Sequence, residues 1–168
     1  MSRRVVVWLI PIFLTIHNAE EAVAFRHYLP MTRELLPAPL ASLEAHLSYA
    51  ALLQALAGLS ILAFLLALVV NARPGAQRSL WLLLVLEMAV GLNVLAHLAS
   101  AALLFHGYGP GLVTALLVNA PFAVYCFRRA KREQWVGSTA LRATVPAALM
   151  LHGPVLLAGL WLATILSR

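Results

Sequence analysis

Five long runs of apolar residues, almost free of charge, constrain the fold of this 168-residue chain more than any other feature. A helix needs about 20 apolar residues to cross the ~30 Å hydrocarbon core of a bilayer, and each run has about that length. An open sheet cannot satisfy its backbone hydrogen bonds in lipid, so we interpret the runs as helices. They are residues 5–25, 47–70, 79–105, 111–127 and 143–166.

The composition agrees with a membrane protein. Hydrophobic residues make up 62% of the chain and charged residues 11%, where soluble proteins average about 45–50% and 25%. We therefore predict one integral membrane domain over residues 1–168, an all-α polytopic bundle of about five transmembrane helices that contacts the lipid bilayer. The single cysteine, Cys126, excludes an internal disulfide and a cysteine-based zinc site.

The positive charge lies in short segments between the apolar runs, which is the pattern that sets membrane topology and argues against a nucleic-acid partner. With the N-terminus inside, nine basic residues lie inside and three outside. The inside set is Arg3, Arg4, Arg73, Arg78, Arg128, Arg129, Lys131, Arg132 and Arg142; the outside set is Arg26, Arg33 and Arg168. We predict an N-inside, C-outside orientation in the plasma (inner) membrane.

Two segments near the N-terminus have their own interpretations. Residues 26–46 carry three prolines and are predicted to form an ordered loop or a surface helix. The N-terminal arginines, the first apolar run and the small residues 22–24 resemble a cleavable signal peptide. The adjacent acids Glu20 and Glu21 argue against cleavage.

Ionisable side chains at membrane depth are energetically costly and indicate function. The first run contains His17, Glu20 and Glu21, whose spacing places them on one side of a helix. The third run contains Asn93 and His97, four residues apart on one face. All five fall in the outer half of the hydrocarbon core. His46, at the outer edge of the second run, and Asn119, in the fourth, fall at similar depth, so we predict a polar layer shared by several helices.

Two neutral imidazoles with one or two carboxylates suit zinc or non-haem iron and leave coordination positions open, as a catalytic metal requires. We predict a divalent metal held by His17, His97 and either Glu20 or Glu21. The other glutamate would act as a base toward a metal-bound water. Asn93 would orient a ligand through a hydrogen bond.

A structural interpretation of the same residues is also open. If the first span is shorter, Glu20 and Glu21 lie at the headgroups, solvated and paired with Arg26 or Arg33. His97 could then serve an interhelical hydrogen bond.

Other residues in the spans have structural interpretations too. Glu87 and His152 form a sparser second polar layer and could pair with each other. Gly58, Gly91 and Gly159 are predicted to allow close helix packing.

Three motifs resemble those of the HXXEE family of integral membrane proteins. Residues 17–21 read His-Asn-Ala-Glu-Glu, Asn93 and His97 match an Asn-x-x-x-His element, and residues 108–114 match Tyr-x-Pro-Gly-x-x-Thr. The resemblance supports the residues already chosen and adds Tyr108 as a catalytic candidate. It also implies that the Gly-Pro-Gly turn at 109–111 starts the next helix beside His97. The family's shared polar residues suggest an enzyme, but they indicate no substrate.

The leading hypothesis is a membrane-embedded metal-dependent enzyme, hydrolysis slightly favoured over oxidation, with a lipidic or apolar substrate entering from the outer leaflet. A metal-free isomerase or cyclase is the first alternative: two neighbouring carboxyl groups in low dielectric favour a retained proton on one of them, which suits an isoprenoid-like substrate. A small proton or ion transporter, haem ligation by paired histidines, and a non-enzymatic scaffold are further alternatives. The oligomeric state stays open.

Overall fold

The computed structural model describes residues 1–35, 48–73 and 75–166, and this part of the chain is helical with no strand. The predicted all-α fold is therefore confirmed. The elements are α1 (Arg3–Leu35), α3 (Tyr49–Ala72), α4 (Gln77–Leu103), α5 (Leu112–Thr114), the π-helical turn η2 (Ala115–Asn119), α6 (Ala120–Arg132), α7 (Ser138–Met150), the π-helical turn η3 (Leu151–Val155) and α8 (Leu156–Leu166).

Four helical stretches are long and apolar enough to cross a membrane: Arg3–Met31, Tyr49–Ala72, Gln77–Leu103 and Ser138–Gly159. They identify the chain as a membrane protein. The expected span at 111–127 is not among them, because it is divided among α5, η2 and α6 and the last turn of α6 is basic. The fifth crossing stays a prediction.

Helix α1 extends further than expected. It continues without a break through residues 26–35, where we predicted a loop or a separate surface helix, and it includes Pro30. An apolar stretch alone does not mark the end of a helix, because an amphipathic turn can extend it beyond the bilayer. Residues 36–46 of that predicted segment lie outside the described residues.

Both π-helical turns adjoin prolines. Pro121 lies two residues after the end of η2, and Pro154 lies inside η3. Proline has no amide hydrogen and its ring clashes with the carbonyl four residues before it. A wider π turn accommodates that clash within a helical run, and such turns occur often at functional sites. The η2 turn starts directly after Thr114, which becomes important below.

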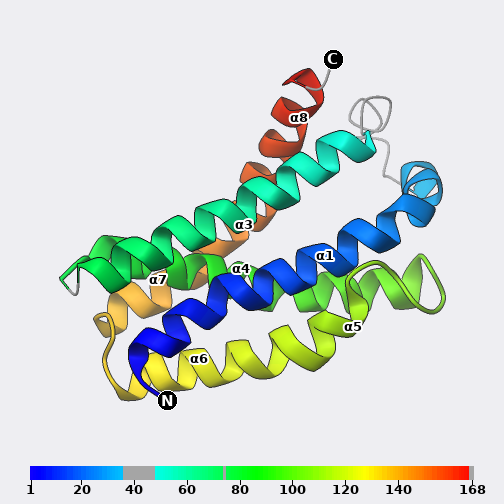
Figure 1. The fold of residues 1–168 in the computed structure, drawn as a ribbon. Helices are drawn as coiled ribbons and strands as arrows, with labels where there is room; N and C mark the ends of the chain where they lie inside the picture. The colour runs from blue at the N-terminus through cyan, green and yellow to red at the C-terminus, as the bar shows by residue number, and fades with distance from the viewer. Residues whose placement is uncertain (36–47, 74, 167–168) are drawn as a thin grey trace.

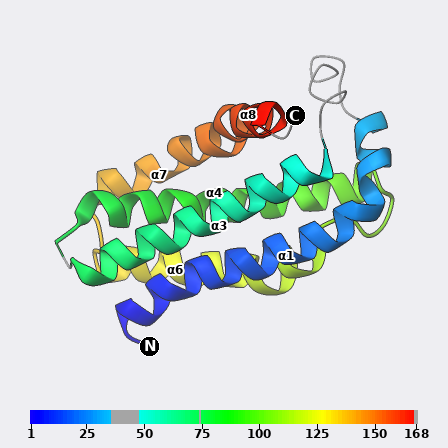
Figure 2. The ribbon, with the colours of Figure 1, turned by 45° about the horizontal axis from the view of Figure 1, so that its top comes forward.

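The helices run side by side along one long direction, with α3 beside α1 and α4 beside α7 (Figures 1 and 2). The largest apolar core lies at the end of the bundle that carries the N-terminus. It joins Val6, Val7 and Ile10 of α1, Ala67 and Val70 of α3, Leu80, Leu83 and Leu84 of α4, Phe122, Cys126 and Ala130 of α6, and Trp135 and Val136 of the following turn. The predicted polar residues of α1 and α4 come after these core residues along α1 and α4.

Of the three glycines predicted to allow close helix packing, only Gly91 does so. A Cβ atom added to Gly91 would lie 3.4 Å from the Cβ of Ala123 on α6. A Cβ atom added to Gly58 or Gly159 would have nothing within 4 Å. The packing prediction is wrong for these two residues, since the space beside them is open.

Candidate functional site

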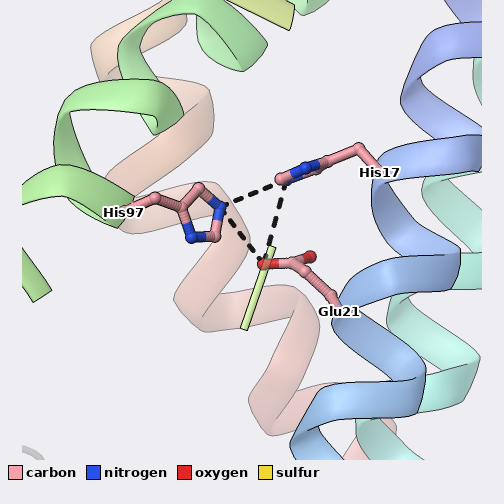
Figure 3. Close-up of side chains that lie close together, drawn as sticks. All are labelled: His17, Glu21 and His97. Carbon is pink, nitrogen blue, oxygen red and sulfur yellow. Dashed lines mark hydrogen bonds and ion pairs between the residues drawn. The ribbon is translucent and has the colours of Figure 1, made fainter. Parts of the chain in front are cut away.

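His17, Glu21 and His97 converge between α1 and α4 (Figure 3). Helix α1 supplies His17 and Glu21, one turn apart, and α4 supplies His97. The two Nε2 atoms lie 3.1 Å apart. The Oε1 atom of Glu21 is 3.4 Å from Nε2 of His97 and 4.0 Å from Nε2 of His17. We call these three side chains the His–Glu cluster.

The dimensions of the His–Glu cluster suit a metal ion. Ligand atoms bound to tetrahedral zinc at 2.0–2.1 Å lie about 3.3 Å from one another. The separations of 3.1 and 3.4 Å are close to that value, and the separation of 4.0 Å needs only a small movement of Glu21. His17 and His97 are 1% and 8% exposed, so bulk water does not compete for them.

The other ring nitrogen of His17 is held by a threonine. Nδ1 of His17 lies 2.9 Å from the hydroxyl oxygen of Thr114, which lies 2.5 Å from Oε2 of Glu20. A hydroxyl has one hydrogen and a carboxylate only accepts, so Thr114 donates to Glu20 and accepts from Nδ1–H of His17. The Nε2 atom of His17 then carries a lone pair that points into the His–Glu cluster.

The same tautomer follows for His97. The amide nitrogen of Asn93 can only donate a hydrogen bond, and it faces Nε2 of His97. That nitrogen therefore acts as the acceptor and carries a second lone pair. The amide nitrogen of Asn93 lies 2.8 Å from Nε2 of His97 and 3.2 Å from Nε2 of His17. Asn93 therefore contacts both rings, in the place expected for an orienting residue.

The two glutamates that the sequence left as alternatives have different surroundings. Glu20 faces away from the histidine rings and accepts four hydrogen bonds. They come from the hydroxyl of Tyr108 at 2.8 Å, the amide of Val113 at 3.1 Å, and the amide and hydroxyl of Thr114 at 2.7 and 2.5 Å. Glu21 is the carboxylate that reaches the histidines. The two residues are thus distinct in role, although both were candidates as ligand and base.

Tyr108 contacts Glu20 rather than the histidines. Burial and its hydrogen bond to Glu20 raise the pKa of Tyr108 to about 12. The hydroxyl stays protonated at neutral pH and remains a hydrogen-bond donor. Its position makes Tyr108 a residue that holds Glu20 in place.

A glycine turn covers the His–Glu cluster. Gly111 has a φ angle of +78°, and an added Cβ atom would lie 2.7 Å from Cε1 of His97 and 2.8 Å from both Cε1 of His17 and Cγ of Glu21. Both the backbone conformation and the close approach require glycine here. The sequence placed Gly111 in a turn but did not reveal this contact, and it missed the link through Thr114. The only signal was the position of both residues in the third motif.

A cavity of about 550 Å³ opens on the other side of the His–Glu cluster. His17, Glu21 and Asn93 form its polar end, and apolar side chains of α1, α3, α4 and α8 form most of its walls. Its volume lies within the ~300–1,000 Å³ typical of small-molecule sites. The arrangement can hold a metal ion at the end of an apolar chamber.

The expected pair of Glu87 and His152 does not form among the described residues. His152, on η3, lines the cavity. Glu87 is 2% exposed, and its Oε1 atom has no hydrogen-bond partner. Similar depth in two spans did not imply contact. His46, expected at the edge of the second span, lies outside the described residues.

Comparison with known proteins identifies one family. The model of a family described as a protein of unknown function with HXXEE motif matches residues 8–126. The matched region contains the His–Glu cluster, Asn93 and the Tyr108–Thr114 segment. No curated protein and no solved structure matches the sequence.

Proposed function

This chain belongs to the HXXEE family, and we propose that its motif residues hold a divalent metal ion in a membrane-embedded enzyme. One observation carries the proposal: two imidazole lone pairs and a carboxylate oxygen converge within 4.8 Å at the end of an apolar cavity. Two lone pairs facing each other at 3.1 Å repel unless a proton or a cation lies between them.

The proposed ligands are His17, Glu21 and His97, and the metal is zinc or iron. His17 and Glu21 line the cavity, so water or a substrate oxygen could approach a metal held by these residues from that side. A bound metal supplies Lewis-acid chemistry and an activated water, so we favour hydrolysis of a lipidic substrate over oxidation.

The residues around the ligands position them. Glu20 and Thr114 fix the tautomer of His17, and such partners typically raise metal affinity. Because four donors already occupy its oxygens, Glu20 is better suited to this role than to that of a base.

We place the His–Glu cluster in the outer half of the bilayer of a five-span, N-inside protein of the plasma (inner) membrane. The arrangement of charge supports this orientation. Val6 and Val7 pack in the same core as Val70, Leu80 and Trp135. The basic residues that neighbour these positions in sequence therefore gather at one end of the bundle, and that end is the cytoplasmic one by the positive-inside rule.

A metal-free acid–base enzyme is the second candidate, and one contact favours it. The amide of Asn93 is within hydrogen-bond distance of both Nε2 atoms and can donate to both lone pairs when no metal is present. Glu21 would then face the cavity as the proton-transferring group, with an isoprenoid-like substrate.

Elemental analysis of the detergent-purified protein separates the two candidates. We expect about one zinc or iron per chain in the wild type, and its loss in His17→Ala, His97→Ala and Glu21→Gln. The control is His27→Ala, also on α1 but exposed, which should retain the metal. Circular dichroism and gel filtration verify folding. A folded wild type that binds neither metal after incubation with zinc and ferrous iron would overturn the metal proposal and favour the acid–base enzyme.

A further inference from the structure

Most of the wall of the cavity beside the His–Glu cluster is apolar. Beyond His17, Glu21 and Asn93 its walls are mostly leucine, valine and alanine, with Asn18 on α1, Gln54 on α3 and His152 on η3 as the other polar side chains. The amide of Asn18 is already bonded to Leu56 and Ser60 of α3. A second polar group on a bound molecule would lose its hydration over most of this wall, which is costly without a partner. The distribution of polar side chains in the cavity suits a molecule with one polar end.

Two sides of the His–Glu cluster are filled by the chain itself. The turn at Gly111 lies against all three side chains, so nothing fits between them and the turn. Toward the N-terminus, Ile10 and Leu14 belong to packed apolar clusters. Among the residues that the structure describes, the cavity is the open space that the His–Glu cluster adjoins, so we take it as the route for a substrate.

The cavity reaches the surface of the bundle where α3 and α8 meet. Leu62 of α3 and Leu162 of α8 line it and are 47% and 52% exposed, so it is continuous with the surroundings there. Gly58 and Gly159 line it from the same two helices, and a Cβ atom at either would have nothing within 4 Å. The space that larger side chains would fill at these positions is empty. Figure 1 shows α8 alongside α3 at this end of the bundle.

We propose that the substrate is a single-chain amphiphile that enters from the bilayer between α3 and α8. Its polar end lies at the His–Glu cluster, and its apolar chain runs past Gly58 and Gly159, which determine the width of the chain that fits. That the polar end of this substrate binds the metal rests on the proposed function. The cavity of about 550 Å³ is within the size range of small-molecule sites, so one chain of this kind is a plausible occupant by volume.

Photocrosslinking tests this path without knowledge of the natural substrate. The probe is a 12-carbon fatty alcohol with a diazirine at its far end, added at low mole fraction to phosphatidylglycerol nanodiscs that hold the protein. Peptide mass spectrometry locates the label. In the wild type we expect label at the cavity residues of α3 and α8, removed by excess unlabelled dodecanol.

The variants are Gly58→Leu and Gly159→Leu, with the matching alanine substitutions as milder versions. Leucine favours a helix more than glycine does, so folding should not suffer. We expect at least a tenfold loss of competed label with leucine and a smaller loss with alanine. The control is Gly75→Leu, in the α3–α4 turn, where an added Cβ atom also meets nothing within 4 Å. It should label like the wild type.

The outcomes separate this inference from the metal proposal. Label that dodecanol does not compete, or that both leucine variants retain, overturns the inference. Metal analysis of the same samples is independent: the leucine variants should keep their metal. A wild type that carries competed label but no metal would retain the amphiphile path and reject the metal.

Discussion

At the scale of single residues, two neighbouring glutamates have separate tasks. Glu21 faces the histidines, whereas Glu20 is bound by donors from Tyr108, Val113 and Thr114. Positions one residue apart on a helix differ by about 100° in direction. The sequence spacing predicted which side of α1 is polar, but only the segment packed against it decides which glutamate meets which partner.

Thr114→Val tests the link between Glu20 and His17. Valine has a similar shape but no hydroxyl, so Nδ1 of His17 loses its acceptor and the ring is free to change tautomer. We expect zinc affinity to fall about 10–100-fold, as is typical for the loss of such a partner. Thr114→Ser should restore most of it. Affinity is measured by competition with a chelator, and a valine variant with wild-type affinity would refute the link.

At the scale of helices, α4 contributes residues to the site and also buries a carboxyl group that destabilises the bundle. His97 and Asn93 lie on the face of α4 that meets α1, as their spacing predicted. Two turns earlier, Glu87 is buried with one carboxyl oxygen unpartnered. Such a group costs free energy that an apolar side chain of similar shape would not.

Glu87→Met should therefore stabilise the bundle. Methionine keeps the length of the side chain and removes the unpartnered oxygen, so we expect the midpoint of thermal unfolding in detergent to rise by a few degrees. The control is Glu34→Met, at an exposed position of α1, which should leave the midpoint unchanged. A lower midpoint for Glu87→Met, with an unchanged control, would mean that Glu87 makes a stabilising contact.

The sequence predicted the elements better than their interruptions. The length of the apolar runs predicted α1, α3 and α4, because a helix that crosses lipid must be hydrophobic along its length. The spacing of polar residues predicted the polar faces of α1 and α4. It did not give the π-helical turn before Pro121, the continuation of α1 past Arg26, or the open space at Gly58 and Gly159. The open space depends on the packing of neighbouring helices, which no local pattern contains. The π-helical turn and the longer α1 depend on local backbone geometry, which the length of an apolar run does not report.

At the scale of the whole molecule, the orientation has a direct test. In a Cys126→Ala background, Gly75→Cys and Gly137→Cys should react with a membrane-impermeant maleimide only after lysis, because both lie near the basic end. Gly107→Cys should react in intact cells. Equal accessibility of residues 107 and 137 would mean that the segment 111–127 does not cross the membrane, and a reversed pattern would mean the opposite orientation.

The contacts of Glu20 also have a consequence for how the protein is made. Its donors lie 88 to 94 residues further along the chain. When α1 leaves the ribosome, these partners have not yet been synthesised, and a carboxyl group in lipid without partners is costly. We therefore expect helix α1 to reach its final position in the bilayer only after the segment with Tyr108 and Thr114 has emerged.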